Sequence, residues 1–329
     1  MGKDIFRVQK VTKAFGSRVI LDNINLDIVS GEIIGLIGAS GTGKTTLLNT
    51  LIGFLRPEEG DVLFRRDHLL STSDSEIFRS VFQKQQVVKQ VYGFASQVPS
   101  FYGDLTTQEN LKYFGNLHNL SKDAINSNVK TLLELMELKD AHDVKAKKLS
   151  GGMERRLDIA CALMHDPDVL ILDEPTADLD PLLRNHIWEL IRKINKKGTT
   201  IILSSHHLNE LESLCDRVAF LKNGKLAAVG APDKLKEDFV LDQEIALQTK
   251  EREYEKLTGK LKHKDIKDIK VKNNFLLIYT QKPEVIIEHA LKTIRKEGQQ
   301  LTFINITNAS LDDVFITIWK KKAKDKEAK

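Results

Sequence analysis

Short, wholly apolar runs alternate along much of this chain with longer segments in which hydrophobic positions recur at helical spacing. The runs at 33–37 and 169–172 are bounded by turn residues, which is typical of strands buried on both faces of a parallel sheet. The pattern predicts an α/β domain, with a helical subdomain at about 105–165, where no convincing strand occurs. Helices are expected at 45–54, 108–117, 122–137, 152–164 and 182–196.

The pattern changes after residue 236. Four short stretches predict strands, and two segments with helical spacing predict helices between them. This order indicates a small α+β domain of ferredoxin-like type over residues 243–319, without a phosphate-binding loop, a metal-ligand spacing or a nucleophile constellation. The strands are expected at 245–249, 269–272, 275–279 and 302–306, and the helices at 252–261 and 283–296.

Charge separates the end of the chain from the rest. The 329 residues carry 50 Lys plus Arg against 46 Asp plus Glu, and the basic tail at 320–329 holds six lysines and two acids. The remainder is neutral, which argues against a protein that binds nucleic acid through a wholly basic surface, so no nucleic-acid partner is expected. For the tail we expect a solvated, disordered end, with attraction to anionic lipid as the alternative.

No stretch approaches the roughly 18 consecutive apolar residues that would span a bilayer, and the first ten residues lack the apolar region of a signal peptide. A cytoplasmic chain is therefore expected, unless a partner holds it elsewhere. Cys161 and Cys215 lie in segments typical of buried helix, so we expect small buried side chains rather than a disulfide or a metal site.

A glycine-rich loop follows the strand at 33–37 and opens the next helix. It fits the pattern of Gly, four residues, then Gly-Lys-Ser/Thr, in which backbone N–H groups and the helix dipole face phosphates. Lys44 would reach the β- and γ-phosphate oxygens, and Thr45 would ligate Mg²⁺. The alternative is an ordinary glycine-rich turn. The candidate nucleotide-binding residues are Gly38, Ala39, Ser40, Gly41, Thr42, Gly43, Lys44, Thr45 and Thr46.

The strand at 169–172 leads directly into two adjacent carboxylates, Asp173 and Glu174. Two acids can stand together at the end of a buried strand only if a cation lies close to them. Asp173 would hold Mg²⁺ directly or through water, and Glu174 would accept a proton from the attacking water. The alternative is a strand end with solvated acids, which a nearby phosphate-binding loop disfavours.

Leu149-Ser150-Gly151-Gly152-Met153, just upstream of these acids, resembles the signature motif of the ATP-binding cassette (ABC) ATPases. The resemblance covers about residues 4–236, and residues 177–180 match the family's D-loop. It implies a P-loop NTPase fold, a nucleotide-binding domain over 1–236, and ATP with Mg²⁺ as ligands.

Three further positions take their roles from the resemblance. Gln97 matches the Q-loop glutamine, which implies that it bridges Mg²⁺ and the attacking water. His206 matches the switch histidine, a donor to the γ-phosphate, with His207 as the competing candidate. Phe15 falls where the family places an aromatic residue that stacks on adenine; the alternative is a core residue.

Ser150, Gly151 and Gly152 begin a predicted helix and so form a second anion-binding site of N–H groups and a hydroxyl. In the family, this motif closes on the ATP held by another subunit, which implies a head-to-tail dimer with a second copy or a related chain. Three departures stand out: Met153 replaces the usual Gln, Asp178 replaces a small residue, and the segment 65–89 is longer than usual.

The signature at 149–156 and the segment Ser310-Leu311-Asp312-Asp313-Val314-Phe315 resemble the ATPase subunits of type-2 ABC exporters. This implies a separate transmembrane permease, docked near residues 98–102, and a place on the inner face of the cell membrane. For the apolar and aromatic residues at 98–102, ordinary anchoring of the loop is the alternative. The alternative is a soluble ABC ATPase of translation or DNA repair, which would bring a second cassette or a long coiled coil. A degenerate scaffold is disfavoured because Lys44, Asp173, Glu174 and His206 are intact.

Overall fold

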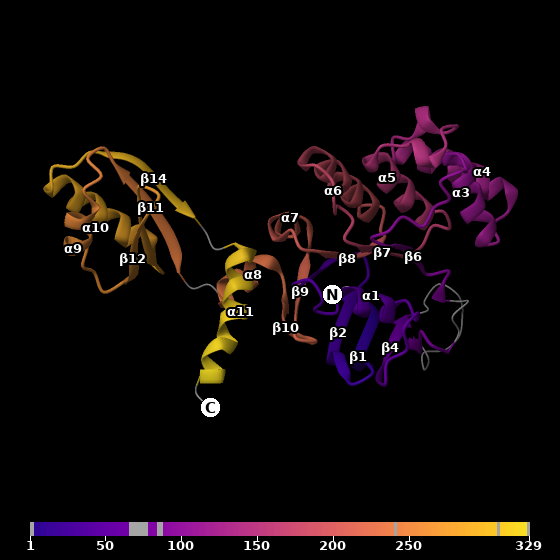
Figure 1. The fold of residues 1–329 in the computed structure, drawn as a ribbon, viewed down its shortest axis with the longest axis horizontal. Coiled ribbons are helices and arrows are strands. Elements are labelled where there is room, and N and C mark those ends of the chain that lie inside the picture. Colours follow the sequence, from indigo (N-terminus) through magenta and orange to yellow (C-terminus); the bar gives the residue numbers. More distant parts are fainter. Residues whose placement is uncertain (1–2, 66–77, 84–87, 240–241, 308–309, 328–329) are drawn as a thin grey trace. The chain divides into compact units, whose positions relative to one another are not determined.

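The computed structural model describes residues 3–65, 78–83, 88–239, 242–307 and 310–327 (Figure 1). Contacts divide the chain into two compact units, Met1–Ala231 and Pro232–Lys329, and each has a hydrophobic core of its own. Within the described residues, no helix has both the length and the apolar character needed to cross a membrane.

The first unit is built on a six-stranded sheet with the order β10-β9-β3-β8-β7-β6. Strand β10 pairs antiparallel with β9, and the other neighbours are parallel. The strands predicted at 33–37 and 169–172 are confirmed, and β3, β7 and β8 are buried throughout, as expected for strands covered on both faces. The strands are Ile33–Ile37 (β3), Tyr92–Ala95 (β6), Val169–Asp173 (β7), Thr200–Ser205 (β8), Arg217–Lys222 (β9) and Lys225–Gly230 (β10).

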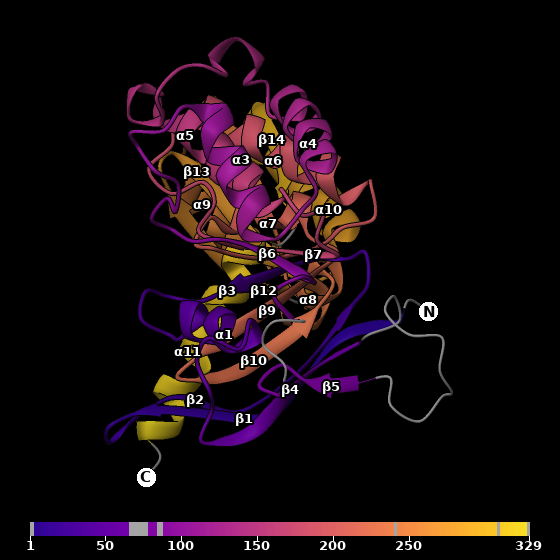
Figure 2. The same ribbon diagram turned by 90° about the vertical axis from the view of Figure 1, so that its right-hand side faces the viewer.

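A second, antiparallel sheet has the order β2-β1-β4-β5, and helix α1 (Lys44–Leu51) lies between the two sheets (Figures 1 and 2). Leu47, Leu48 and Leu51 of α1 are fully buried in the core that both sheets share. This sheet was not predicted, although β2 alternates buried and exposed positions from Ile24 to Ile28, which is the pattern of a strand with one buried face. Its strands are Asp4–Phe15 (β1), Arg18–Val29 (β2), Glu59–Arg65 (β4) and Phe78–Ser80 (β5).

Between β6 and β7 the chain forms three α-helices, two short 3-10 helices and no strand, with a single isolated bridge between Thr106 and Lys145 (Figure 2). Polar side chains cap each α-helix: Thr106 forms a capping box with Glu109, and Ser121 and Ser150 accept hydrogen bonds from the first turns of the next two. The helices predicted here are confirmed within one or two residues. They are Thr107–Leu117 (α3), Lys122–Leu135 (α4) and Gly151–Ala162 (α5).

Two more helices, α6 (Pro181–Asn195) and α7 (Leu208–Leu214), follow β7 and β8. The two cysteines behave as predicted. Cys161 and Cys215 are buried and unbonded to each other, and burial raises the pKa of both thiols, so they pack as small apolar side chains.

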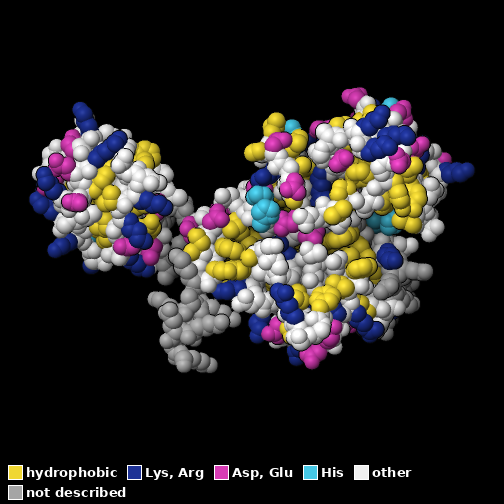
Figure 3. Space-filling model, in the orientation of Figure 1, with side chains coloured by type: hydrophobic (Ala, Val, Ile, Leu, Met, Phe, Trp, Pro, Cys, Tyr) yellow, Lys and Arg dark blue, Asp and Glu magenta, His cyan; other side chains and the backbone are white. Residues whose placement is uncertain are grey.

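The second unit contains a four-stranded antiparallel sheet with the order β12-β13-β11-β14. With α9 and α10, its elements follow the β-α-β-β-α-β order of the predicted ferredoxin-like fold. Hydrophobic side chains also reach its surface between Lys and Arg (Figure 3). The elements are Gln243–Thr249 (β11), Tyr254–Lys260 (α9), Ile266–Lys272 (β12), Phe275–Thr280 (β13), Pro283–Lys296 (α10) and Leu301–Thr307 (β14).

The ferredoxin-like part lies in the sequence between two helices that contact each other, α8 (Pro232–Phe239) and α11 (Leu311–Glu327). Its first and last strands are neighbours, since Glu244 of β11 pairs with Thr307 of β14. The sequence analysis did not predict α11. The expectation of a disordered tail at 320–329 is wrong as far as Glu327, because α11 continues to that residue, and 328–329 lie outside the described residues.

The long segment noted at 65–89 lies largely outside the described residues, which omit 66–77 and 84–87.

Candidate functional site

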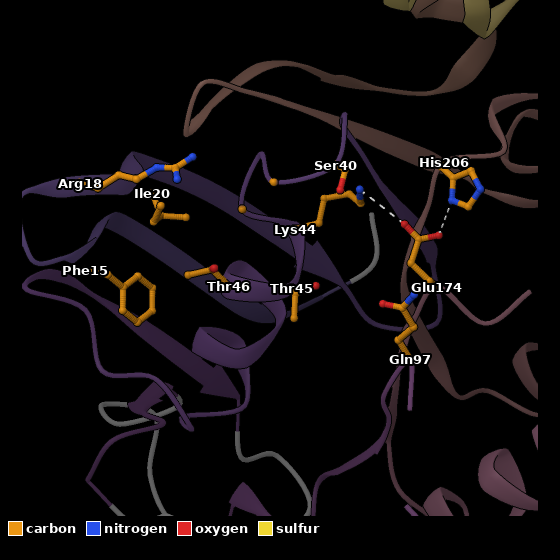
Figure 4. A pocket seen from close by; sticks show the side chains of 12 residues that line it. Phe15, Arg18, Ile20, Ser40, Lys44, Thr45, Thr46, Gln97, Glu174 and His206 are labelled. Carbon is orange, nitrogen blue, oxygen red and sulfur yellow. Dashed lines mark hydrogen bonds and ion pairs between the residues drawn. The ribbon is translucent and has the colours of Figure 1, made fainter. Parts of the chain in front are cut away.

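The C-terminal ends of the parallel strands meet at one edge of the six-stranded sheet, where they open onto a cavity of about 750 Å³. This is where ligands bind in open α/β sheets. Most of the predicted nucleotide residues face it, together with Arg18 and Ile20, which the sequence analysis missed (Figure 4). The lining comprises Phe15, Arg18, Ile20, Ser40, Gly41, Gly43, Lys44, Thr45, Thr46, Gln97, Glu174 and His206.

The phosphate-binding loop joins β3 to α1. Gly43, at the start of α1, has φ 106°, a left-handed value that a residue with a side chain rarely adopts. Lys44 is buried, and its Nζ donates to the carbonyl of Gly38 at 2.8 Å and lies 3.5 Å from Glu174 Oε1. The loop therefore holds its ammonium group at the cavity wall. Gly38, Ala39 and Thr42 shape the loop without lining the cavity.

Asp173, at the end of β7, is 3% exposed and is held by two hydroxyl groups. Thr45 Oγ1 donates to Oδ2 at 2.8 Å, and Ser204 Oγ donates to Oδ1 at 2.5 Å. Thr45, Asp173 and the nearby amide of Gln97 offer only hard oxygen ligands, which suits Mg²⁺. Ser204, which the sequence analysis did not single out, comes from β8 and fixes the carboxylate from the side opposite to Thr45.

Glu174 is the first residue beyond β7 and has a left-handed φ of 48°. Its N–H donates to Ser204 Oγ at 2.9 Å, so the strained backbone is fixed by a hydrogen bond. The carboxylate lies between two cationic or donor groups: Lys44 on one side and His206 on the other, with 2.8 Å between Glu174 Oε2 and His206 Nδ1 (Figure 4).

Of the two candidate histidines, His206 is the one that the structure brings to the cavity. His207 instead precedes α7, and burial together with the neighbouring His206 lowers the pKa of its ring. The motif alignment and the geometry therefore favour the same residue.

The opposite end of the cavity is apolar and cationic. Phe15 ends β1 with 51% of its surface exposed, so the alternative that it is a core residue is wrong. Arg18 and Ile20 follow on β2 after a short turn and lie near it at this end (Figure 4). Their alternation along β2 was the available signal, since residues two apart on a strand share a face.

The signature residues do not line this cavity. Ser150 caps α5, and its Oγ accepts from Met153 N–H at 3.4 Å. Gly151 lines a separate hollow of about 210 Å³, which Gln97 and Glu174 also reach. Gly152 is buried, and a Cβ there would lie 2.9 Å from Leu183 Cδ2, so this glycine permits close packing against α6. Within one chain, the start of α1 and the start of α5, each suited to an anion, therefore line different cavities.

Phosphate binding by backbone N–H groups at a strand-to-helix turn is the chemistry of P-loop nucleotide-binding proteins, and fold and site place this chain among them. A family model described as "ABC transporter" matches residues 21–177. The chain is 33% identical to the "Nod factor export ATP-binding protein I" of Burkholderia lata over 319 residues, which are 96% of this chain and 97% of that protein.

Two other comparisons agree. The chain is 34% identical to the "Probable multidrug ABC transporter ATP-binding protein YbhF" of Escherichia coli, over 74% of this chain and 40% of that protein. Its fold matches cbiO1 from Clostridium perfringens, described as part of the ABC transporter complex cbiONQ, with a TM-score of 0.64 and 27% identity over 72% of this chain and 92% of that one. The chain belongs to the family of ABC transporter ATP-binding proteins, and it binds and hydrolyses ATP.

Proposed function

We propose that this chain is the ATPase subunit of an exporter and drives a separate transmembrane permease from the inner face of the cell membrane. The match to an export subunit along nearly the whole length of both chains supports this role. Among the relatives compared, the Burkholderia and Escherichia proteins carry export or multidrug transporter names, which favours transport over translation or DNA repair. Val98 and Tyr102, 75% and 50% exposed beside Gln97, are the proposed docking surface for the permease.

The placement of Glu174 between Lys44 and His206 carries the proposed mechanism. Lys44 and the N–H groups of the phosphate loop hold the β- and γ-phosphates, and Phe15 stacks on the base. Glu174 accepts a proton from the attacking water, which Gln97 helps to orient, and His206 donates to the γ-phosphate. The Glu174 carboxylate is 13% exposed, so few water molecules compete at this position.

Thr45, Asp173 and Gln97 are the proposed ligands of Mg²⁺. When bound, the ion would neutralise charge that develops on the phosphates. Ser204 and Thr45 hold the two oxygens of the Asp173 carboxylate by hydrogen bonds, which fixes its position at the proposed metal site. Ethylenediaminetetraacetate is expected to stop hydrolysis, and added Mg²⁺ to restore it.

The separation of the two helix starts supports a dimer in which Ser150, Gly151 and Gly152 of one copy complete the ATP site of the other. We assign residues 1–236 to the nucleotide-binding domain, with a helical subdomain at about 105–165. Residues 243–319 form the accessory domain, for which we propose no catalytic role. A second copy or a related subunit would satisfy the same geometry.

Replacing Glu174 by Gln tests the proposal. ATP binding should persist, the hydrolysis rate should fall at least about 100-fold, and an ATP-dependent dimer should accumulate in sedimentation. Glu189→Gln, at an exposed position on α6, is the matched control. Unchanged turnover of Glu174→Gln would remove the assigned base, and co-sedimentation with ribosomes rather than membranes would remove the transport role.

A further inference from the structure

Helix α5 carries a buried ion pair that is not part of the ATP cavity. Arg155 and Asp158 are 7% and 0% exposed, and 3.2 Å separates Arg155 Nη1 from Asp158 Oδ2. Burial lowers the pKa of Arg155 and raises that of Asp158, so each charge is maintained against a desolvation cost. Such a pair is weak evidence for stability, because apolar replacements often fold as well.

The guanidinium of Arg155 donates to three backbone carbonyls from two other segments. Its Nη1 reaches Ser96 O at 2.6 Å, immediately before Gln97. Its Nη2 reaches Asp173 O at 3.1 Å and its Nε reaches Pro175 O at 2.9 Å, on either side of Glu174. The three carbonyls are reached by three different nitrogens of one planar fork, whereas an ammonium group has its three donors on a single atom and cannot spread them in the same way.

Asp158 contacts the same loop beyond Gln97, at Ser100. Its Oδ1 accepts hydrogen bonds from Ser100 N–H and from Ser100 Oγ, each at 2.9 Å. Residues 96 and 100 are therefore both tied to α5, and the short segment between them contains Gln97. Neither Arg155 nor Asp158 was singled out by the sequence, because nothing local indicates which distant carbonyls they meet.

We propose that Arg155, held by Asp158, is a positioning residue that links the signature helix to Gln97 and Glu174. The start of α5 faces the ATP of a second copy in the dimer proposed above, on which this inference rests, whereas Gln97 and Glu174 act on the chain's own ATP. When the start of α5 docks on the ATP of the second copy, Arg155 therefore positions Gln97 and Glu174 at the ATP of its own chain. The consequence is that hydrolysis at each site depends on occupancy of its neighbour.

Arg155→Lys tests this link, because it keeps the charge opposite Asp158 but loses the fork. The neighbouring Arg156→Lys is the control, since Arg156 binds Met136 O and Glu137 within the helical region. For Arg155→Lys we expect the dissociation constant of a fluorescent ATP analogue to change less than about twofold, since α1 is untouched. The maximal hydrolysis rate should fall at least about tenfold, and the Hill coefficient for ATP should fall towards 1.

A second variant separates positioning from folding. Arg155→Met combined with Asp158→Leu removes the pair without leaving a buried charge, but the three backbone carbonyls that Arg155 reaches lose their donor. This variant should be less stable than the wild type, yet still fold and bind the analogue, and it should show the same loss of rate and cooperativity. Adding Gln97→Ala to Arg155→Lys should cost less than the product of the two single effects, because both act through Gln97.

Wild-type rate and cooperativity in Arg155→Lys or in the apolar pair, a wild-type Hill coefficient of 1, or multiplicative losses with Gln97→Ala would each overturn the link. These outcomes leave the proposed function intact if wild-type protein still hydrolyses ATP and forms an ATP-dependent dimer. Absence of that dimer would instead overturn the proposed function.

Discussion

Helices α1 and α5 both begin with backbone N–H groups suited to an anion, but their surroundings differ. The start of α1 is enclosed by side chains from β1, β2 and the ends of β6, β7 and β8, and it opens onto the larger cavity. The start of α5 is capped by exposed Ser150, and Gly151 beside it is exposed as well. Both helices have a positive N-terminal end. The start of α1 is surrounded by residues of its own chain, whereas the start of α5 is left open.

In the proposed mechanism, the residues around α1 supply ATP binding, metal ligands and the base, whereas the signature residues at the start of α5 do not line the same cavity. Binding is therefore expected to depend on the residues around α1, and turnover on both helix starts.

The largest change that we expect is in the affinity for ATP, and it should distinguish the start of α1 from the start of α5. Lys44→Ala removes a charged donor from the cavity, so the dissociation constant for ATP should rise about 100-fold in isothermal titration of the monomer. Ser150→Ala should change that constant less than about twofold. An equal loss of ATP affinity in the two variants would mean that α5 contacts the ATP of its own chain, which contradicts the difference between the two helix starts.

Phe15 allows a second test, at the end of the cavity where the adenine base is proposed to bind. Phe15→Ala should raise the KM for ATP roughly tenfold through lost stacking, with little change in kcat, and Phe15→Trp should restore it. Steady-state kinetics with ATP provide the measurement. A fall in kcat at constant KM would place Phe15 in the reaction rather than in binding.

Mixing two inactive variants tests whether the open start of α5 serves another chain. Lys44→Ala protein has an intact α5, and Ser150→Arg protein has an intact α1, so a mixed dimer contains one complete site. An equimolar mixture should hydrolyse ATP faster than either variant alone, but at less than about the quarter of the wild-type rate that independent sites would give, because the second site of the mixed dimer does not hold ATP. Each variant alone is the control, and a mixture no more active than either would contradict the shared site.

A further prediction concerns the stability of the fold rather than ATP, at the far end of α5. Burial, and then the stacked ring of His118, lower the pKa of His165 to about 4, so the folded state favours the neutral ring. The unfolded state binds a proton more readily between about pH 6.5 and 4, and the free energy of unfolding should therefore decline as pH falls through that window. After allowance for partial exposure, the loss is about 2 kcal/mol.

Urea unfolding at pH 7 and pH 5 measures this decline. His165→Gln should show a smaller decline, because Gln keeps a donor for the Tyr92 carbonyl that His165 Nε2 contacts and does not titrate. Identical pH dependence in both proteins would show that other groups control acid stability.

Much of the site could be predicted because its chemistry is local in sequence. The loop from Gly38 to Thr45 and the acids Asp173 and Glu174 each follow an apolar strand, and parallel strands end at a common edge, so their meeting follows from the pattern. Arg18, Ser204 and Arg155 were missed for the opposite reason. Their partners lie on other segments, and only the register of β2, the pairing of β7 with β8 and the packing of α5 bring them together.

The elements of the fold also differ in how far the sequence alone predicts them. Continuous apolar runs made β3 and β7 evident, whereas β1 of the antiparallel sheet alternates buried and exposed positions irregularly and shifts its register. The helix α11 was not predicted, although Leu311, Val314 and Ile318 follow helical spacing and are buried. Its continuation to Glu327 is a backbone property that charge alone does not reveal.

The adjacent ends of the ferredoxin-like part have a consequence for modularity. Because Glu244 and Thr307 pair in neighbouring strands, the chain enters and leaves this domain at nearly the same place, between two helices that contact each other. Insertions with close ends are the ones that proteins accept and lose most readily. Joining α8 to α11 through a short glycine-serine linker should therefore yield a folded ATPase, and another small domain with close ends could be grafted at the vacated position.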